Sequence, residues 1–356
     1  MSSLIVVHAE FDATWPFAAD HWHSRWQAEG PTRFVRLRRD DRRTLGEVLG
    51  EAASGVEGGA GGETGAVTRA AVLGVPVTPS CLDVLPTVRE AVILDPYRPA
   101  LTPEVEARLA ARGVELYRQQ SEGFWGQSVA EFALALTLCA LRGIPQQYRA
   151  MLESHEVWGR YSAARNRGPG QRGAQFSDDV RFTHGTLAGK RVRVAGAGNI
   201  GSRYASFAHS LGAEVAAWDP YAPEPSFHRA GARRIWRLEE LVQDAEIFAP
   251  MLPLTEQTRG LVTAQHMDAL PKGCLVVLAT RAGICDMAAL RRRVLADEVA
   301  LAADVFDMEP LPLDDPLLGR ENVVHTPHLA GRTRDANIAW VEMLLAQFRR
   351  GPAAGG

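Results

Sequence analysis

The segment VRVAGAGNIGSRYASFAHSLGAEVAAWDP, residues 192–220, is the most informative part of this sequence. It predicts a buried strand, a glycine turn, an amphipathic helix and a second strand. Gly196, Gly198 and Gly201 form the pattern G-x-G-x-x-G. The first glycine permits a tight turn, the second lets backbone approach a pyrophosphate, and the third lets helix and strand pack closely. The free N–H groups at the start of the helix would then face the phosphates.

An acidic residue closes the second strand of this unit. Asp219 stands 18 residues after Gly201, the spacing at which a carboxylate binds the adenosine ribose hydroxyls. It would repel a 2′-phosphate, and Pro220 and Tyr221 supply no arginine to hold one. The sequence therefore predicts that the turn binds NAD rather than NADP. The alternative is a glycine turn that binds no ligand.

The rest of the chain fits an α/β protein. From residue 190 onward, short apolar runs alternate with helical patterns, which predicts a doubly wound parallel sheet. Strands are also predicted over 4–9, 70–79 and 90–95, and a helix over 102–113. We expect loops at 53–65, which is rich in glycine, and at 159–185, which contains Arg160, Arg165, Arg167 and Arg172 and has no apolar period.

Bulk properties exclude several classes of protein. A chain of 356 residues suits two domains, and a net charge of −3 does not suggest nucleic acid as a partner. The first residues carry neither a basic segment nor a long apolar run, so we expect no signal peptide or membrane span there. The four cysteines form no C-x-x-C pair, which predicts no metal site and favours a cytoplasmic protein.

Six motifs in a fixed order resemble the D-2-hydroxyacid dehydrogenases, the family of D-lactate, D-glycerate and D-3-phosphoglycerate dehydrogenases. The resemblance implies a Rossmann cofactor domain, residues 127–331, inserted into a smaller flavodoxin-like substrate domain formed by 1–126 and 332–356, with the active site in the cleft between them. The motifs are SVAEFALAL (128–136), TLAGKRVRVAGAGNIG (186–201), LPLTEQTRGLV (252–262), ATRAGICDMAAL (279–290), AADVFDMEPLP (302–312) and VVHTPHLAG (323–331).

The resemblance also implies the chemistry. Arg281 would hold the substrate carboxylate and polarise the carbonyl, since its planar fork suits bidentate contact. His328 would be the acid in reduction and the base in oxidation, and Glu309 would orient it and favour its charged form. The residues implied to bind the cofactor are Gly196, Gly198, Asn199, Ile200, Gly201, Asp219, Leu252, Pro253, Thr258, Ala279, Thr280, Asp304, which would lie near the nicotinamide, His328 and Gly331.

The substrate half departs from the family pattern. The family's Gly-x-Gly turn is replaced by DPYRPALTPE (95–104), where Tyr97 or Arg98 could contact the substrate, or the loop could simply be re-routed. Phe124 and Trp125 stand at the expected hinge and could line the cleft or pack the hinge. Ala279 and Met251 occupy positions where the family often has asparagine and histidine.

The leading hypothesis is an NAD-dependent oxidoreductase that interconverts a D-2-hydroxy acid and its 2-keto acid. The alternatives are an NAD-sensing corepressor-like protein and a phosphite-type dehydrogenase on the same fold. Residues 128–143 are apolar almost all round, and the family pairs its cofactor domains there, so we expect a homodimer.

Overall fold

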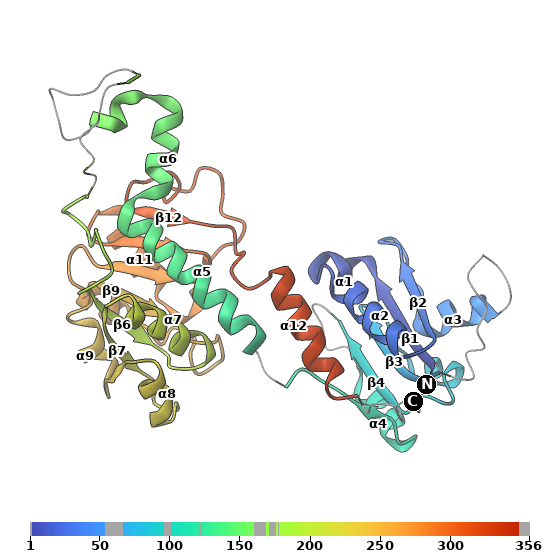
Figure 1. Ribbon diagram of the computed structural model, residues 1–356. Helices are drawn as coiled ribbons and strands as arrows, with labels where there is room; N and C mark the ends of the chain where they lie inside the picture. The colour runs from blue at the N-terminus through green and yellow to red at the C-terminus, as the bar shows by residue number, and fades with distance from the viewer. Residues whose placement is uncertain are drawn as a thin grey trace. The chain divides into compact units, whose positions relative to one another are not determined.

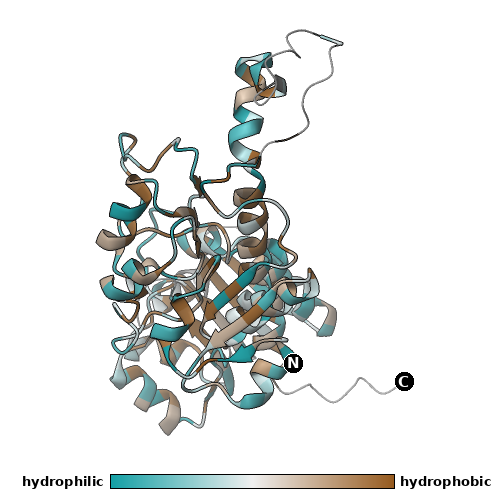
Figure 2. Cartoon of the chain, turned by 90° about the vertical axis from the view of Figure 1, so that its left-hand side faces the viewer, coloured by the Kyte–Doolittle hydropathy of each residue, from teal (hydrophilic) through white to brown (hydrophobic). Residues whose placement is uncertain are grey.

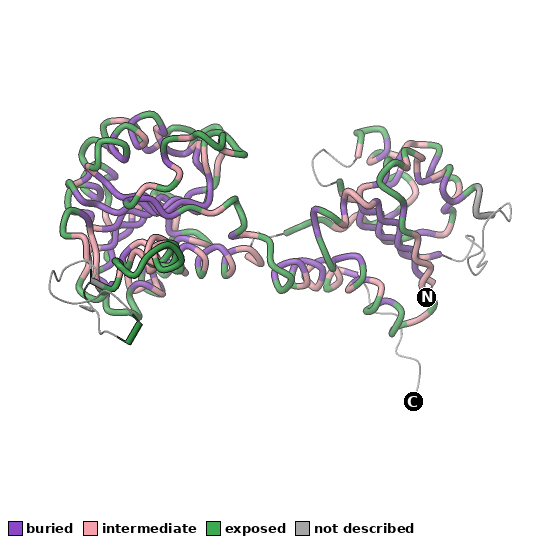
Figure 3. Tube along the Cα trace, turned by 90° about the horizontal axis from the view of Figure 1, so that it is seen from above, coloured by how far each residue is buried: buried purple, intermediate pink, exposed green. Residues whose placement is uncertain are grey.

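The computed structural model describes residues 2–53, 67–95, 101–120, 123–159, 169–170, 176 and 178–348. Their backbone forms two compact units, one of residues 1–124 and 332–356 and the other of residues 125–331. Each unit is built on its own parallel sheet, and in both units the strands are the most buried part of the trace (Figures 1 and 3). The α/β fold class predicted from the sequence is confirmed.

The first unit contains a five-stranded sheet in the order β2-β1-β3-β4-β5, which is the flavodoxin-like order. Its elements are β1 (Ser2–His8), α1 (Ala9–Thr14), α2 (Ala18–Glu29), β2 (Thr32–Leu37), α3 (Leu45–Ala53), β3 (Val67–Leu73), a 3₁₀ helix (Pro79–Val84), β4 (Glu90–Leu94), α4 (Pro103–Ala111), β5 (Glu115–Leu116) and the C-terminal α12 (Arg334–Leu345).

Aromatic side chains pack the helices of this unit. Trp22 and Trp26 on α2 are fully buried, and both pack edge-on against Phe348 beyond α12. Trp15 stacks on Trp340 of α12 with ring centroids 4.2 Å apart. Burial of aromatic rings is among the largest contributions a side chain makes to packing. The C-terminal helix is therefore an integral part of the first unit.

The second unit contains a seven-stranded parallel sheet in the order β12-β11-β10-β9-β6-β7-β8. The order reverses between β6 and β9, which makes this the switch point where open α/β sheets bind ligands. Its elements are α5 (Gly123–Arg142), which begins in the first unit, α6 (Ile144–Glu153), a 3₁₀ helix (His155–Gly159), β6 (Arg191–Ala195), α7 (Asn199–Ser210), β7 (Glu214–Trp218), α8 (Glu224–Arg229), β8 (Arg233–Arg234), α9 (Leu238–Val242), β9 (Ile247–Pro250), α10 (Ala264–Ala269), β10 (Leu275–Leu278), a 3₁₀ helix (Ala282–Ile284), α11 (Met287–Leu295), β11 (Ala300–Ala303) and β12 (Val323–His325).

Helix α5 lies in the core of the second unit. Val129, Ala130, Ala133, Leu136 and Leu141 are buried in the same apolar cluster as the strands. Within the part of the chain that the structure describes, α5 is the one helix long and apolar enough to cross a membrane by length and composition. Its packing against the sheet is that of a core helix.

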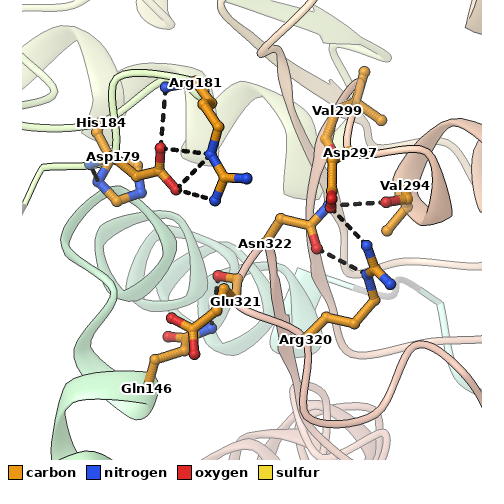
Figure 4. Close-up of polar contacts among 10 residues, drawn as sticks. All are labelled: Gln146, Asp179, Arg181, His184, Val294, Asp297, Val299, Arg320, Glu321 and Asn322. Atoms are coloured by element: carbon orange, nitrogen blue, oxygen red, sulfur yellow. Dashed lines mark hydrogen bonds and ion pairs between the residues drawn. The ribbon is translucent and has the colours of Figure 1, made fainter.

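Helix α6 extends away from the sheet (Figures 1 and 2), and its first turn is tied to the start of β12. The side-chain amide of Gln146 donates to the carbonyls of Glu321 (3.2 Å) and Val323 (2.9 Å), as Figure 4 shows for Glu321. Beside this contact, Asn322 donates to the carbonyls of Val294 and Val299 and so closes the turn between α11 and β11.

The sequence did not predict α1, α2, β2, α3, β5, α6 or α12, and the strand predicted over 70–79 ends at Leu73. The glycine-rich stretch expected as a loop at 53–65 lies outside the described residues except for Ala53, as does most of the loop expected at 159–185, including its four arginines.

Candidate functional site

The glycine turn has the geometry that a phosphate requires. Gly196 has a φ of +105°, and a Cβ there would lie 2.7 Å from the carbonyl oxygen of Met251. A Cβ on Gly201 would lie 2.0 Å from the carbonyl oxygen of Gly196, so helix α7 can start this close to β6 only with glycine. A Cβ on Gly198 would meet no atom within 4 Å. The open side of the turn is therefore where a pyrophosphate can approach the N-terminus of α7, whose first residues are Asn199 and Ile200.

Asp219 is tied directly to this turn. Its Oδ2 accepts a hydrogen bond from the backbone N–H of Ala197 (2.8 Å), and its Oδ1 accepts from the N–H groups of Tyr221 and Ala222 (2.9 Å each). The contacts fix the carboxylate at the end of β7, beside the strand that carries the turn. Oδ1 already accepts two hydrogen bonds, whereas Oδ2 accepts one and has a further lone pair that can accept from a ribose hydroxyl. The residues present therefore fit an adenosine dinucleotide.

An arginine that the sequence argument overlooked also lies at this edge. Arg234, at the end of β8, donates to the backbone carbonyl of Asp219 (3.4 Å) and to Glu224 (3.1 Å). Its guanidinium lies over the rings of Phe227 (4.8 Å) and Trp236 (4.0 Å). The pairing of β7 with β8 brings the cation beside Asp219, which a search for basic residues next to Asp219 in sequence could not find.

The remaining predicted cofactor residues follow the carboxyl ends of β9 and β10. Leu252 is buried after β9, and Pro253 starts a turn in which its carbonyl accepts a 2.5 Å hydrogen bond from Thr258. Thr280 follows β10 and donates to the carbonyl of Pro250 (3.2 Å), next to the buried Ala279. Because parallel strands end at the same edge, these residues share the edge of the glycine turn.

The structure brings Glu309 and His328 together although 18 residues separate them along the chain. The Nδ1 of His328 and the Oε2 of Glu309 are 2.7 Å apart. The other oxygen of Glu309 accepts from the N–H of Phe306 (2.7 Å), which orients the carboxylate. Both side chains remain partly exposed, at 44% for His328 and 32% for Glu309. The pair is therefore accessible, and its geometry is that of an imidazole oriented by a carboxylate.

Asp304 holds the loop that carries His328. The side chain is fully buried at the end of β11, where Oδ1 accepts from the Oγ1 of Thr326 (2.6 Å) and the N–H of Leu329 (2.9 Å). Its Oδ2 accepts from the N–H of Ala330 (2.9 Å). These donors lie on both sides of His328, whose φ of +58° is unusual for a residue with a side chain. The anchoring contacts oppose relaxation of that backbone, a role for Asp304 that the motif did not reveal.

Arg281 lies three residues beyond β10, at the same edge of the sheet, and is exposed. Its Nη1 donates to the carbonyl of Thr280 (2.7 Å), which leaves other donors of the guanidinium for a ligand. Gly331 ends the loop of His328, where the carbonyl of Ala330 accepts from Ser128 of α5 (2.6 Å). Among the described residues, no group of three or more His, Cys, Asp or Glu side chains is arranged to hold a metal ion.

The two candidate substrate residues that the structure describes pack within different units. Phe124 packs near Trp15 in the first unit, with ring centroids 6.3 Å apart. Trp125 packs against the apolar cluster of the second unit. Tyr97 and Arg98 lie outside the described residues.

Comparison with known proteins identifies relatives of this chain. Residues 134–330 match the family model described as the D-isomer specific 2-hydroxyacid dehydrogenase, NAD binding domain. The D-3-phosphoglycerate dehydrogenase of Archaeoglobus fulgidus is 34% identical over 221 residues, which cover 62% of this chain and 38% of that protein. The glyoxylate reductase of Korarchaeum cryptofilum is 26% identical over 240 residues, covering 66% of this chain and 67% of that protein.

Solved structures share the fold over almost the whole chain. An NAD-complexed D-isomer specific 2-hydroxyacid dehydrogenase from Lactobacillus delbrueckii ssp. bulgaricus has a TM-score of 0.67 at 16% identity, covering 97% of this chain and 95% of that one. D-mandelate dehydrogenase from Rhodotorula graminis has a TM-score of 0.64 at 17% identity, covering 97% and 93%.

The fold and the glycine turn define a two-unit, Rossmann-type nucleotide-binding protein. The chain belongs to the D-isomer specific 2-hydroxyacid dehydrogenase family, and residues 134–330 are its NAD-binding domain. The match to the A. fulgidus dehydrogenase spans well under half the length of that protein.

Proposed function

We propose that this protein is an NAD-dependent oxidoreductase that interconverts a D-2-hydroxy acid and its 2-keto acid. The observation that carries the proposal is the 2.7 Å contact between His328 and Glu309 at the sheet edge that also bears the glycine turn. An oriented imidazole beside a nicotinamide site is the arrangement that reversible proton and hydride transfer requires.

Each residue of the proposed site has a distinct task. Glu309 accepts from Nδ1 of His328, which leaves Nε2 to give a proton to the forming alkoxide in reduction or to take it from the hydroxyl in oxidation. Arg281 binds the substrate carboxylate and orients the carbon that reacts. Bound NAD(H) supplies the hydride chemistry. Asp219 and the glycine turn hold the adenosine and pyrophosphate ends of the dinucleotide.

The proposal is tested by removing the imidazole. His328→Ala should lower kcat by roughly a hundred- to ten-thousand-fold, because a general acid–base group contributes that much. Binding of NADH, measured by its fluorescence, should be nearly unchanged. The matched control is His325→Ala, since His325 lies on β12 in the same segment. Equal turnover by both variants would rule out the proposed role of His328.

The role of Glu309 has its own readout. A carboxylate next to an imidazole favours the charged imidazolium. Glu309→Gln should therefore move the midpoint of the pH profile of kcat/KM for hydroxy-acid oxidation to lower pH. An unchanged midpoint would show that Glu309 does not act on His328.

The substrate itself is proposed at the level of its class. Two relatives are named for D-3-phosphoglycerate and glyoxylate, so both 3-phosphohydroxypyruvate and glyoxylate belong in an assay panel. We propose that the first unit recognises the substrate side chain, with Tyr97 or Arg98 supplying contacts where the Gly-x-Gly turn is missing.

We also propose that the protein is a homodimer. Leu134 and Leu138 of α5, where the sequence placed the interface, are half-buried within the chain. The more exposed apolar side chains lie on α6: Ile144 (50%), Tyr148 (67%), Met151 (53%) and Leu152 (74%). Their spacing puts them on one side of the helix, and an apolar stripe of this kind usually marks an interface. The centre of the proposed contact is therefore α6, continuous with α5.

Light scattering tests the dimer. Tyr148→Glu and Leu152→Glu should give monomers. Arg149→Glu, which reverses the charge at an exposed position outside the stripe and breaks an exposed ion pair with Glu153, should leave the dimer intact. A wild-type chain that scatters as a monomer at micromolar concentration would refute the proposal.

We also propose that the protein is cytoplasmic, because its four cysteines are free thiols, as is typical of a reducing compartment.

A further inference from the structure

Glu309 lies in a long connection that has no regular secondary structure. The chain leaves β11 at Ala303 and enters β12 at Val323. Because Glu309 lies outside the hydrogen-bonded strands, side-chain contacts must hold its part of the chain in place. Arg291 of α11 supplies such contacts.

Arg291 of α11 contacts this connection on both sides of Glu309. Its Nη2 donates to the Oδ2 of Asp315 (2.7 Å), and its Nη1 is 3.8 Å from the Oδ1 of Asp307. The Arg291 and Asp315 side chains are only 21% and 7% exposed. The contact to Asp315 is therefore shielded from solvent, unlike most surface ion pairs, and a forked guanidinium suits contact with two carboxylates.

Both ends of the contact are themselves fixed. Helix α11 is capped by Asp286, which accepts from the N–H of Ala289 (2.9 Å), and Leu290 beside Arg291 is buried. On the loop side, Asp315 also accepts from the N–H of Leu317 (2.9 Å). Arg291 thus joins a rigid helix to an anchored turn.

We propose that Arg291 is a positioning residue for the acid–base pair: by tying Asp307 and Asp315 to α11, it holds Glu309 at its 2.7 Å contact with His328. The inference rests on the proposed function. Arg291 forms its ion pairs with Asp315 and Asp307 and not with Glu309 or His328, so it acts through the loop. Freeing the loop lets the carboxylate move from the imidazole and weakens the support of the imidazolium.

The test compares two neighbouring arginines of one helix. Arg291→Gln removes the loop contact, and Arg292→Gln is the matched control, because Arg292 pairs with the exposed Asp268 away from the loop. Arg291→Gln should lower kcat/KM by roughly ten- to a hundred-fold, the cost of a misplaced catalytic group. Its pH profile should move to lower pH, in the direction of Glu309→Gln, while NADH affinity stays unchanged. Arg292→Gln should match the wild type in all three.

A readout that needs no turnover separates this inference from the proposed function. The ring signals of His328, assigned by their loss in His328→Ala, are compared by NMR in the absence of substrate. In Arg291→Gln they should move toward their positions in Glu309→Gln, and in Arg292→Gln they should stay in place, whether or not a substrate has been found. If Arg291→Gln fails to fold, Arg291→Lys, which keeps the charge but not the fork, should show a smaller shift in the same direction.

The inference is overturned if Arg291→Gln or Arg291→Lys gives the same His328 ring signals and the same turnover as Arg292→Gln. It is also overturned if the Arg291 variants lose only thermal stability while the ring signals of His328 stay fixed, because a merely structural arginine would do that. A wild-type protein that reduces no 2-keto acid would defeat the proposed function, and the NMR comparison would still decide the role of Arg291.

Discussion

Replacing Asp304 by Asn tests how the loop of His328 is held. The carboxylate is fully buried and accepts from Thr326, Leu329 and Ala330 at 2.6–2.9 Å. An amide has the same shape, but one of its two ends is a donor. Whichever way it turns, its NH₂ group faces at least one N–H donor, so a buried donor loses its acceptor. A lost hydrogen bond to a charged group costs about 1.5–3 kcal/mol, so we expect a destabilisation of about 2 kcal/mol.

The assay is thermal unfolding without cofactor. For a domain of about 200 residues, a loss of 2 kcal/mol lowers Tm by roughly 4–8 °C. Asp286→Asn is the control, because Asp286 accepts a single bond at the start of α11 and Asn caps helices equally well. Asp304→Asn should also lower kcat, since it frees the backbone on both sides of His328. A Tm within 1 °C of the control would show that Asp304 does not hold the loop.

Three further predictions concern the cofactor, acid stability and the thiols. The wild type should prefer NAD(H) to NADP(H), although Arg234 lies near Asp219, and Asp219→Ala should weaken that preference in paired KM measurements. Equal use of both cofactors by the wild type would refute the role of Asp219. Burial alone would raise the pKa of Asp315, but hydrogen bonds from Leu317 and Arg291 hold it below its usual value. The stability that this carboxylate adds relative to Asp315→Asn should therefore be full at neutral pH, begin to fall below about pH 4, and be lost as the pH drops through the lowered pKa, as measured by unfolding at each pH. Burial raises the pKa of Cys274 to about 12 and also raises that of Cys285, so both thiols should resist a disulfide reagent at pH 8 until the protein unfolds; rapid labelling of either in the native protein would contradict their burial.

The nucleotide-binding half could be predicted well from the sequence because its signals are local. The glycine spacing, the strand before it and the acid after the second strand each lie within about one βα unit, and the structure places them on one sheet edge. The contact between Asp219 and the turn followed from none of these signals, since it joins the carboxylate to the backbone N–H of Ala197.

The first half was harder to predict because its elements lack clean periodicity. Helix α2 carries Trp22 and Trp26 among charged residues, and its burial depends on Phe348 more than 300 residues away. Contacts of this kind are invisible to a local pattern. The same holds for Arg291 and Arg234, whose sequence neighbours do not reveal what they touch.

The motif order identified the candidate acid–base pair but not what supports it. His328, Glu309 and Arg281 came from the family resemblance, whereas the three donors that converge on Asp304 appear only when β11 and β12 lie side by side. Sequence reasoning assigned Asp304 to the cofactor, and that role stays a prediction beside its observed contacts with the loop.

The most direct test of the central claim is NADH consumption by the purified wild-type protein against glyoxylate, hydroxypyruvate, 3-phosphohydroxypyruvate, pyruvate and phenylpyruvate, with His328→Ala run in parallel. The account predicts that at least one 2-keto acid is reduced to its D-2-hydroxy acid, and that His328→Ala loses this activity while still binding NADH. Tight NADH binding with no turnover of any 2-keto acid, or equal turnover by His328→Ala, would contradict it.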